Sequence, residues 1–243
     1  MMLGSLSLPI VFPVILFFPL LVRHAHAFPE MIRQGYINCN TCHVSPSGGG
    51  VLTRYGRELS GEILSMGSVE NEAQLGHGFV PLPEWLHLGG DLRAVQYFRN
   101  TPQIEEGRFF VMQTDLEAAF QKGPITVGGS TGFYYGQNPE VQSRKHYVIA
   151  KITEKLHARI GKFTPAYGIN IPEHVGFTKR GLGWDQGSET YGAELAWLAE
   201  EVHLHLTASL GQVTFKGGYS FFEKYQIGAS YFRGTGRQVF GPY

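Results

Sequence analysis

The sequence predicts a mainly β protein: a small N-terminal segment with one short helix, then an antiparallel transmembrane β-barrel of about eight to ten strands. Three observations lead to this fold class. Glycine occupies 32 of 243 positions and aromatic residues make up 13%, whereas charged residues reach only 16%, which suits many tight turns better than a helical enzyme. From residue 84 onward, apolar and polar side chains alternate with a period of two. Short turns between these segments alternate with longer loops, as in membrane barrels.

The overall composition excludes several classes of protein. Lys and Arg together number 20, as do Asp and Glu, so the formal net charge is zero and the chain lacks the basic excess of a nucleic-acid-binding protein. Its apolar content of 43% is too high for a disordered chain. Its 2 cysteines cannot form a disulfide-rich scaffold.

Residues 1–27 are predicted to be a signal peptide. Residues 6–22 are uncharged and mostly apolar, and Ala25-His26-Ala27 is the small-x-small pattern at which signal peptidase cuts. The alternative is a retained transmembrane helix, which Pro9, Pro13 and Pro19 disfavour because helix interiors resist proline. Export through this signal places the mature chain, from Phe28 on, outside the reducing cytosol.

A Cys-x-x-Cys-His motif follows eleven residues after the predicted cleavage point, at Cys39, Cys42 and His43. Two thiols with this spacing can add to the two vinyl groups of one haem, and the adjacent imidazole is then held against the iron. The motif therefore predicts one c-type haem attached through Cys39 and Cys42, with His43 as the proximal iron ligand.

Three other interpretations of this motif are open. A thioredoxin-like pair needs a βαβ context, and none follows. A zinc site needs four ligands, and the chain has no further cysteines. A disulfide between Cys39 and Cys42 would close a very small loop and gain little stability.

The haem segment is expected to span 28–80, which is too short to bury a haem alone, so the remaining chain should supply part of the pocket. Apolar side chains between Leu52 and Leu64 predict a short amphipathic helix. The sixth iron ligand is not evident. The candidates near in sequence are Met31, Met66, His77 and His87, with Met66 and His77 retained as weak candidates, and a vacant sixth site is an alternative.

Residues 81–243 are expected to form the barrel. The pattern predicts about nine alternating segments. Each is on the order of ten residues long, the length that a transmembrane β-strand needs. They are centred on 86–94, 110–121, 125–135, 148–152, 156–160, 191–197, 202–210, 213–219 and 225–231. Weak alternation and Pro242 disfavour a further strand in the last seven residues.

A soluble β-sandwich shows the same alternation. Two features favour the membrane: the polar face is strongly charged, as a wet lumen permits, and Tyr and Phe gather near strand ends, as interfacial girdles do. Bacterial single-chain barrels have even strand counts, so nine segments suggest that this chain is an incomplete version of a larger barrel.

The sequence also resembles a known family. FPEMIRQGYINCNTCHVSPSGGGVLTRYGREL, followed by barrel-like segments, is similar to the outer-membrane cytochrome–porin proteins, as is the loop GKFTPAYGINIPEHVGFTKRG at 161–181. The resemblance covers the haem segment closely and the barrel loosely. It implies thioether bonds at Cys39 and Cys42 and His43 as proximal ligand.

For function, this resemblance implies single-electron transfer across the outer membrane of a Gram-negative bacterium. The expected partners are a periplasmic electron carrier, an extracellular donor or acceptor, and outer-membrane lipid, with the haem segment on the periplasmic side or in the lumen. One alternative is a passive porin or binding barrel with a structural haem. Another is a peroxidase-like enzyme, for which His77 or His87 would have to act as distal acid or base.

Weaker constellations have simpler interpretations. Three histidines, His157, His203 and His205, could bind a metal ion in the lumen or could simply line its polar surface. The second interpretation is favoured. A group of basic residues could either line a pore or lie on the solvated surface, and the surface is favoured. These residues are Arg159, Lys162, Lys179 and Arg180. Trp85 and Trp184 are expected at interfaces. Phosphate-loop, Rossmann, nucleophile-elbow and HExxH patterns are absent from the sequence.

Overall fold

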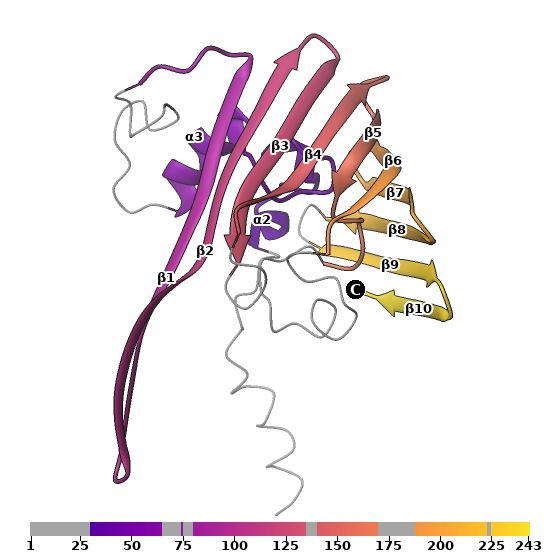
Figure 1. The fold of residues 1–243 in the computed structure, drawn as a ribbon. Coiled ribbons are helices and arrows are strands. Elements are labelled where there is room, and N and C mark those ends of the chain that lie inside the picture. Colours follow the sequence, from indigo (N-terminus) through magenta and orange to yellow (C-terminus); the bar gives the residue numbers. More distant parts are fainter. Residues whose placement is uncertain (1–29, 65–73, 75–79, 135–139, 170–187, 223–224) are drawn as a thin grey trace, which may run out of the picture.

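The computed structural model describes residues 30–64, 74, 80–134, 140–169, 188–222 and 225–243. Within these ranges the protein is mainly β, as predicted, with one ten-stranded antiparallel sheet and few helices (Figure 1). Two short α-helices, α2 (Glu30–Arg33) and α3 (Arg54–Leu64), and the 3₁₀ helix η2 (Cys39–Thr41) precede the sheet. The helix expected from Leu52 to Leu64 is confirmed as α3. In the described part of the chain, no helix is long and apolar enough to cross a membrane.

The sheet is a simple meander in which each strand pairs with the next in the chain, in the order β1 to β10. Such an order follows from consecutive hairpins, which need only short connections. The strands are β1 (Leu86–Thr101), β2 (Ile104–Lys122), β3 (Ile125–Tyr134), β4 (Gln142–Lys151), β5 (Leu156–Phe163), β6 (Thr190–Leu198), β7 (Val202–Ser209), β8 (Gln212–Phe221), β9 (Tyr225–Gly234) and β10 (Arg237–Pro242).

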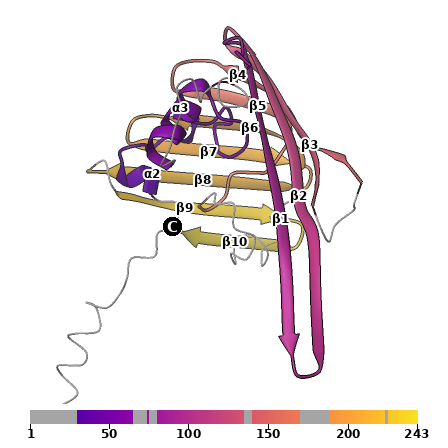
Figure 2. The same ribbon diagram turned by 90° about the vertical axis from the view of Figure 1, so that its left-hand side faces the viewer.

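The sheet is strongly curved, and the N-terminal segment lies inside the curve. Strand direction changes progressively across the sheet, so that β1 and β2 run across the direction of β8 to β10 (Figure 2). Both views place α2 and α3 on the concave side (Figures 1 and 2). We call this side the inner face and the convex side the outer face. Along the described strands, β1 and β10 are the two edges of the sheet and are not paired with each other.

The two faces are inverted relative to those of a soluble protein. The inner face carries the polar side chains, and many of them are buried: His87, Gln113, Asp115, Arg159, Glu194, His203, His205, Thr207, Thr214, Lys216 and Ser230. The outer face carries large apolar side chains that are exposed: Leu116, Phe120, Val127, Ile160, Leu195, Trp197, Leu206, Phe215, Ile227 and Tyr231. The predicted alternation is therefore present, with its polar members facing the N-terminal segment.

Two strands differ from the sequence-based expectation. β1 and β2 contain 16 and 19 residues, longer than the segments 86–94 and 110–121, and residues 94–111 of this hairpin pair only with each other. A register shift between Arg93 and Ala94 breaks the period-two pattern, because a bulge moves side chains to the opposite face. This is why the sequence pattern does not predict residues 95–109 as strand.

The tenth strand corrects the expectation that the last seven residues form none. β10 pairs with β9 from Arg237 to Pro242. Because β10 lies at the edge of the sheet and Pro242 is its last residue, the missing proline N–H interrupts no ladder. The count of nine segments thus becomes ten strands.

Candidate functional site

The Cys-x-x-Cys-His motif forms one tight turn. Cys39 begins the 3₁₀ helix η2, and its carbonyl oxygen accepts hydrogen bonds from the backbone N–H groups of Cys42 at 3.3 Å and His43 at 2.9 Å. This turn brings the two thiols and the imidazole onto adjacent positions of one short piece of backbone. Both thiols are free in this structure.

The chain after the motif folds back on it. His43 forms a β-bridge with Leu52, and the N–H of Val44 donates to the carbonyl of Val51 at 3.0 Å. Between them, Gly48, Gly49 and Gly50 have φ values of 80°, 73° and 71°, a left-handed conformation that glycine adopts without strain. We call residues 38–53 the motif loop.

Helix α3 packs directly on the motif loop. The N–H of Thr53 donates to the carbonyl of Cys42 at 2.9 Å, and the Thr53 Oγ1 caps α3 by accepting from the N–H of Gly56 at 3.1 Å. A Cβ atom at Gly56 would lie 2.3 Å from the Cys42 carbonyl oxygen, so only glycine allows this approach. Gly56 was not predicted from the sequence, because its need for glycine comes from the contact with the Cys42 backbone and not from its neighbours in the chain.

A buried arginine from the sheet holds the other side of the motif loop. The Arg159 guanidinium on β5 donates from Nη1 to Ser45 Oγ at 2.7 Å and from Nη2 to Ser47 Oγ at 3.0 Å. It also forms an ion pair with Glu194 on β6, with Nη2 and Oε2 at 3.0 Å and side-chain exposures of 3% and 0%. The ring of Phe163 lies under the guanidinium, at 3.9 Å from ring centroid to Cζ.

This position corrects one interpretation. Arg159 was expected on the solvated surface, but its side chain is almost fully buried on the inner face, where it joins the motif loop to the sheet. Sequence could not distinguish these environments, because an arginine on the polar face of an alternating strand fits both. Lys162 does lie on the outer face of β5. Lys179 and Arg180 fall outside the described residues.

Further contacts seat the motif loop on the inner face at several strands. Asn38 Nδ2 donates to the carbonyl of Ala199 at 2.8 Å, and Val44 packs against the cluster of Tyr147, Ile149 and Phe163. On the opposite side, Gly50 packs closely against Glu117 of β2: a Cβ atom at position 50 would lie 3.2 Å from Glu117 Oε2. The expectation that the later part of the chain supplies surroundings for the motif thus matches the packing.

The surroundings of the motif favour neutral forms of its three functional groups. Burial raises the pKa of the Cys39 thiol, an effect that the Lys216 ammonium partly offsets. Burial also raises the pKa of Cys42. Burial lowers the pKa of His43, with the Gly50 backbone opposing the shift and Lys145 adding to it. Among the described residues, His43 Nδ1 is buried without a hydrogen-bond partner, whereas the imidazole also interacts with the Gly50 backbone.

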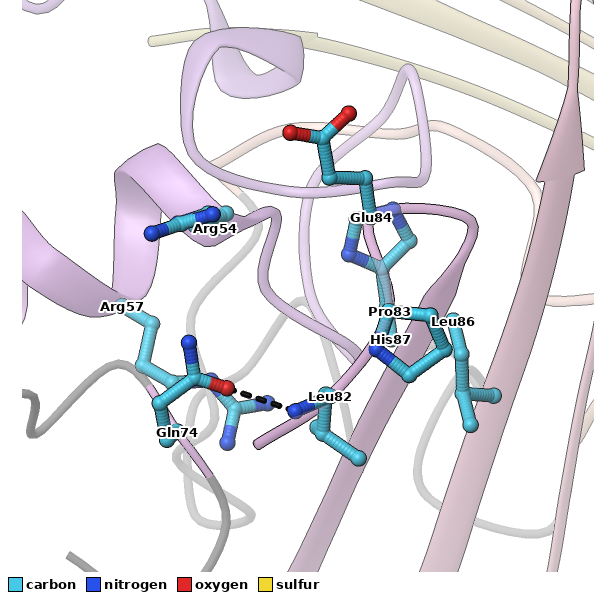
Figure 3. Close-up of a pocket in the computed structure, with 8 residues that line it drawn as sticks. All are labelled: Arg54, Arg57, Gln74, Leu82, Pro83, Glu84, Leu86 and His87. Atoms are coloured by element: carbon cyan, nitrogen blue, oxygen red, sulfur yellow. Dashed lines mark hydrogen bonds between the residues drawn. The ribbon is translucent and has the colours of Figure 1, made fainter. Parts of the chain in front are cut away.

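The candidates for a second axial ligand are only partly described. Met66 and His77 lie outside the described residues, and Met31 is a half-buried residue of α2. His87 lies on the inner face of β1, is 9% exposed, and its Nε2 has no partner among the described residues. It lines a hollow between α3 and the start of β1, together with Arg54, Arg57, Gln74, Leu82, Pro83, Glu84 and Leu86 (Figure 3).

The three histidines considered for a lumen metal site do not form one. His203 hydrogen-bonds to the Tyr243 hydroxyl at 2.9 Å, and His205 Nδ1 lies 3.8 Å from Glu194 Oε1. His157 is near Lys151 and Glu154 at the turn before β5. Across the described ranges, no group of three or more His, Cys, Asp or Glu residues could hold a metal ion. Lining of the polar face, the favoured interpretation, agrees with these contacts.

Of the two tryptophans expected at interfaces, only Trp85 can be placed. It is 53% exposed beside the start of β1 and stacks on Phe120, with ring centroids 6.0 Å apart. Trp184 falls outside the described residues.

Comparison with models of known protein families and with curated, functionally characterised proteins found no match to this chain.

Proposed function

We propose that this protein is an exported c-type haem protein of the Gram-negative outer membrane that passes single electrons between an extracellular partner and a periplasmic carrier. The observation that carries the proposal is the seating of a free Cys-x-x-Cys-His turn on the polar inner face of a sheet whose outer face is apolar. A soluble monomer rarely exposes an apolar face of this extent.

The inverted faces support a membrane environment for the sheet. Leu116 is 66% exposed and Ile160 is 64% exposed on the outer face, whereas Glu194 and Thr207 on the inner face are 2% and 0% exposed. A β-sandwich would bury its apolar face against a second sheet. A transmembrane barrel instead turns its apolar face to lipid and its polar face to the lumen.

Strand length and edges are consistent with the same environment. Strands β3 to β9 contain 8 to 10 residues. At about 3.3 Å of rise per residue and a tilt of about 40°, the ten-residue strands span about 25 Å, the height of the apolar band, and the eight-residue strands span about 20 Å. Lipid offers no hydrogen bonds to an open edge, so in the membrane both β1 and β10 must be paired. We propose that these edges belong to a closed barrel around the motif loop.

The residues of the motif loop fit a covalently attached haem. Cys39 and Cys42 would form the thioether bonds, and the imidazole of His43, whose Nδ1 has no partner among the described residues, would be the proximal iron ligand. When bound, the haem supplies one-electron iron chemistry. The chain's own contribution is to hold the motif: Arg159 fixes the turn at Ser45 and Ser47, α3 packs behind Cys42, and the sheet limits access of water. Burial and hydrogen bonding of this kind set the reduction potential of a haem.

The passive porin with a structural haem remains the alternative. In that case the motif loop would occupy the lumen without redox function, although its seating on the inner face restricts the space available to solutes. A peroxidase-like enzyme would need His87 or His77 beside the iron, and of these only His87 is placed, on the inner face with an uncommitted Nε2.

The test is a reduced-minus-oxidised absorption spectrum of outer-membrane fractions from cells that express the full chain. The proposal expects a c-type spectrum that responds to reductant and haem staining that persists on denaturing gels. A Cys39→Ala/Cys42→Ala double variant, present in the same fraction at the same level, should lose the staining. Folded protein in the outer membrane without haem would contradict electron transfer, and a haem that no reductant can change would support the structural alternative.

A further inference from the structure

A row of three polar side chains interrupts the apolar outer face. His146 on β4, Lys162 on β5 and Tyr191 on β6 lie directly opposite one another in the register of these neighbouring strands. The Nε2 of His146 lies 3.0 Å from the Tyr191 hydroxyl and its Nδ1 lies 2.9 Å from Ser143 Oγ. Lys162 Nζ donates to the carbonyl of Ser143 at 3.0 Å. These contacts assemble the three side chains into one exposed cluster, which we call the outer-face cluster.

The outer-face cluster lies at the boundary of the apolar surface. One step along the strands toward the short turns, Val148 and Ile160 face outward, 39% and 64% exposed, and Leu195 follows on β6 at 49% exposure. The cluster sits near the opposite ends of the strands, since β4 begins at Gln142, β5 ends at Phe163 and β6 begins at Thr190. The motif loop contacts Ala199 in the β6–β7 turn, and β1 starts beside the end of β2. Both therefore lie at the end of the sheet that carries the β2–β3, β4–β5 and β6–β7 turns, which we call the short-turn end. In the proposed barrel, the cluster therefore marks the boundary on the extracellular side.

The charge of the cluster has no counterpart in the described part of the protein. Lys162 contributes an ammonium group and His146 an imidazole, and within the described ranges no carboxylate lies at ion-pair distance from either. At the edge of a hydrocarbon layer an ammonium is poorly hydrated, so an anion supplied from outside the chain would be strongly favoured. A phosphate accepts hydrogen bonds from an ammonium and a phenol hydroxyl together. His146, with both ring nitrogens bound to Ser143 and Tyr191, would hold the Tyr191 hydroxyl in place beside Lys162.

We propose that the outer-face cluster binds the phosphate of a lipid headgroup in the outer leaflet. The inference rests on the proposed membrane location, because the apolar rows beside the cluster would carry the acyl chains of the same molecule. A free phosphate ion would meet only the polar row and would gain nothing from Val148, Ile160 and Leu195. A phosphorylated glycolipid uses both surfaces, and this is why we commit to a lipid as the occupant.

The experiment inserts the full chain into phosphatidylcholine nanodiscs and titrates them with lipid A or with its dephosphorylated form. Bound lipid is counted by native mass spectrometry. Losing one charge-assisted contact corresponds to about a tenfold weaker affinity, so Lys162→Ala should lose about tenfold in lipid A binding and Tyr191→Phe somewhat less. Neither residue supports the inner face, so both variants should insert normally. Lys155→Ala, in the turn that precedes the same strand, is the matched control and should bind as the wild type does.

Three results would overturn the proposal. Equal binding of lipid A and its dephosphorylated form would show that phosphate is not recognised. An equal loss in Lys155→Ala would show only general attraction of charge. Displacement of lipid A by millimolar inorganic phosphate would identify a site for a free ion. All three would leave the membrane location intact, whereas failure of the wild type to enter nanodiscs would overturn the membrane location and this inference together.

Discussion

Removal of the Arg159 guanidinium tests how the motif loop is held on the sheet. In the structure one side chain donates to Ser45, Ser47 and Glu194 from a position that is 4% exposed. In Arg159→Ala the two serine hydroxyls lose the guanidinium but keep each other, with their oxygens 3.2 Å apart, and the Glu194 carboxylate loses its counter-ion. The lost bonds to the serines weaken the contact of the motif loop with the sheet, and the lost ion pair weakens the sheet itself. The two effects can therefore be measured separately.

The expected magnitude follows from these contacts. Hydrogen bonds to a charged group contribute about 1.5–3 kcal/mol each, so losing the bonds to Ser45 and Ser47 should weaken docking of the motif loop by about 3 kcal/mol or more. That corresponds to at least a factor of about 100 in the docked population. Leaving Glu194 buried and unpaired adds a cost of about 3–5 kcal/mol to the sheet, moderated by Thr207, whose Oγ1 donates to Glu194 at 3.2 Å.

Amide hydrogen exchange of residues 43–53, followed by mass spectrometry, measures docking directly. We expect exchange about 100-fold faster in Arg159→Ala, and similarly fast in the double variant Ser45→Ala/Ser47→Ala, which leaves the ion pair with Glu194 intact. Arg159→Lys should exchange at a rate between those of the wild type and Arg159→Ala, since a single ammonium cannot reach both hydroxyls and the carboxylate. Exchange in Arg159→Ala equal to that of the wild type would refute the proposed anchoring.

Three further outcomes follow from the structure. Gly56→Ala places a Cβ 2.3 Å from the Cys42 carbonyl oxygen, so haem content per protein, measured by pyridine haemochrome, should fall severalfold while Ser60→Ala on the same helix retains it. In Cys42→Ala the thioether at Cys39 alone remains, and the haemochrome band should shift to longer wavelength; an unshifted band would show that Cys42 is not attached. Ile160→Arg places a charge on the apolar outer face and should destabilise the protein in vesicles by about 2–4 kcal/mol, as measured by urea unfolding, whereas Lys155→Arg should be neutral.

The strands show how far a periodic pattern predicts a sheet. Where alternation is uninterrupted, as in β7 from Val202 to Ser209, the predicted and observed elements agree closely. The pattern fails at the Arg93/Ala94 register shift, because a local change in pairing moves every later side chain to the other face. It also fails at β10, where pairing with β9 rather than local preference decides that Arg237–Pro242 is a strand.

The candidate site divides in a similar way. Cys39, Cys42 and His43 are recognisable from spacing alone, because their chemistry depends on residues that are adjacent in the chain. Arg159 and Gly56 are not recognisable in this way. The partners of Arg159 lie more than one hundred positions away in the motif loop, and the need for glycine at position 56 arises only when α3 meets the backbone of Cys42.

Sequence by itself determined the short-range features of this protein: the Cys-x-x-Cys-His motif, the short amphipathic helix, and the alternation that separates a polar from an apolar face. Each depends on spacings of a few residues, which the covalent chain sets directly. Only the tertiary structure decided which face turns inward, that the motif loop lies against that face, and that a buried arginine joins the two. These features depend on pairing and packing between distant segments, and such contacts form only when the whole sheet curves around the N-terminal segment.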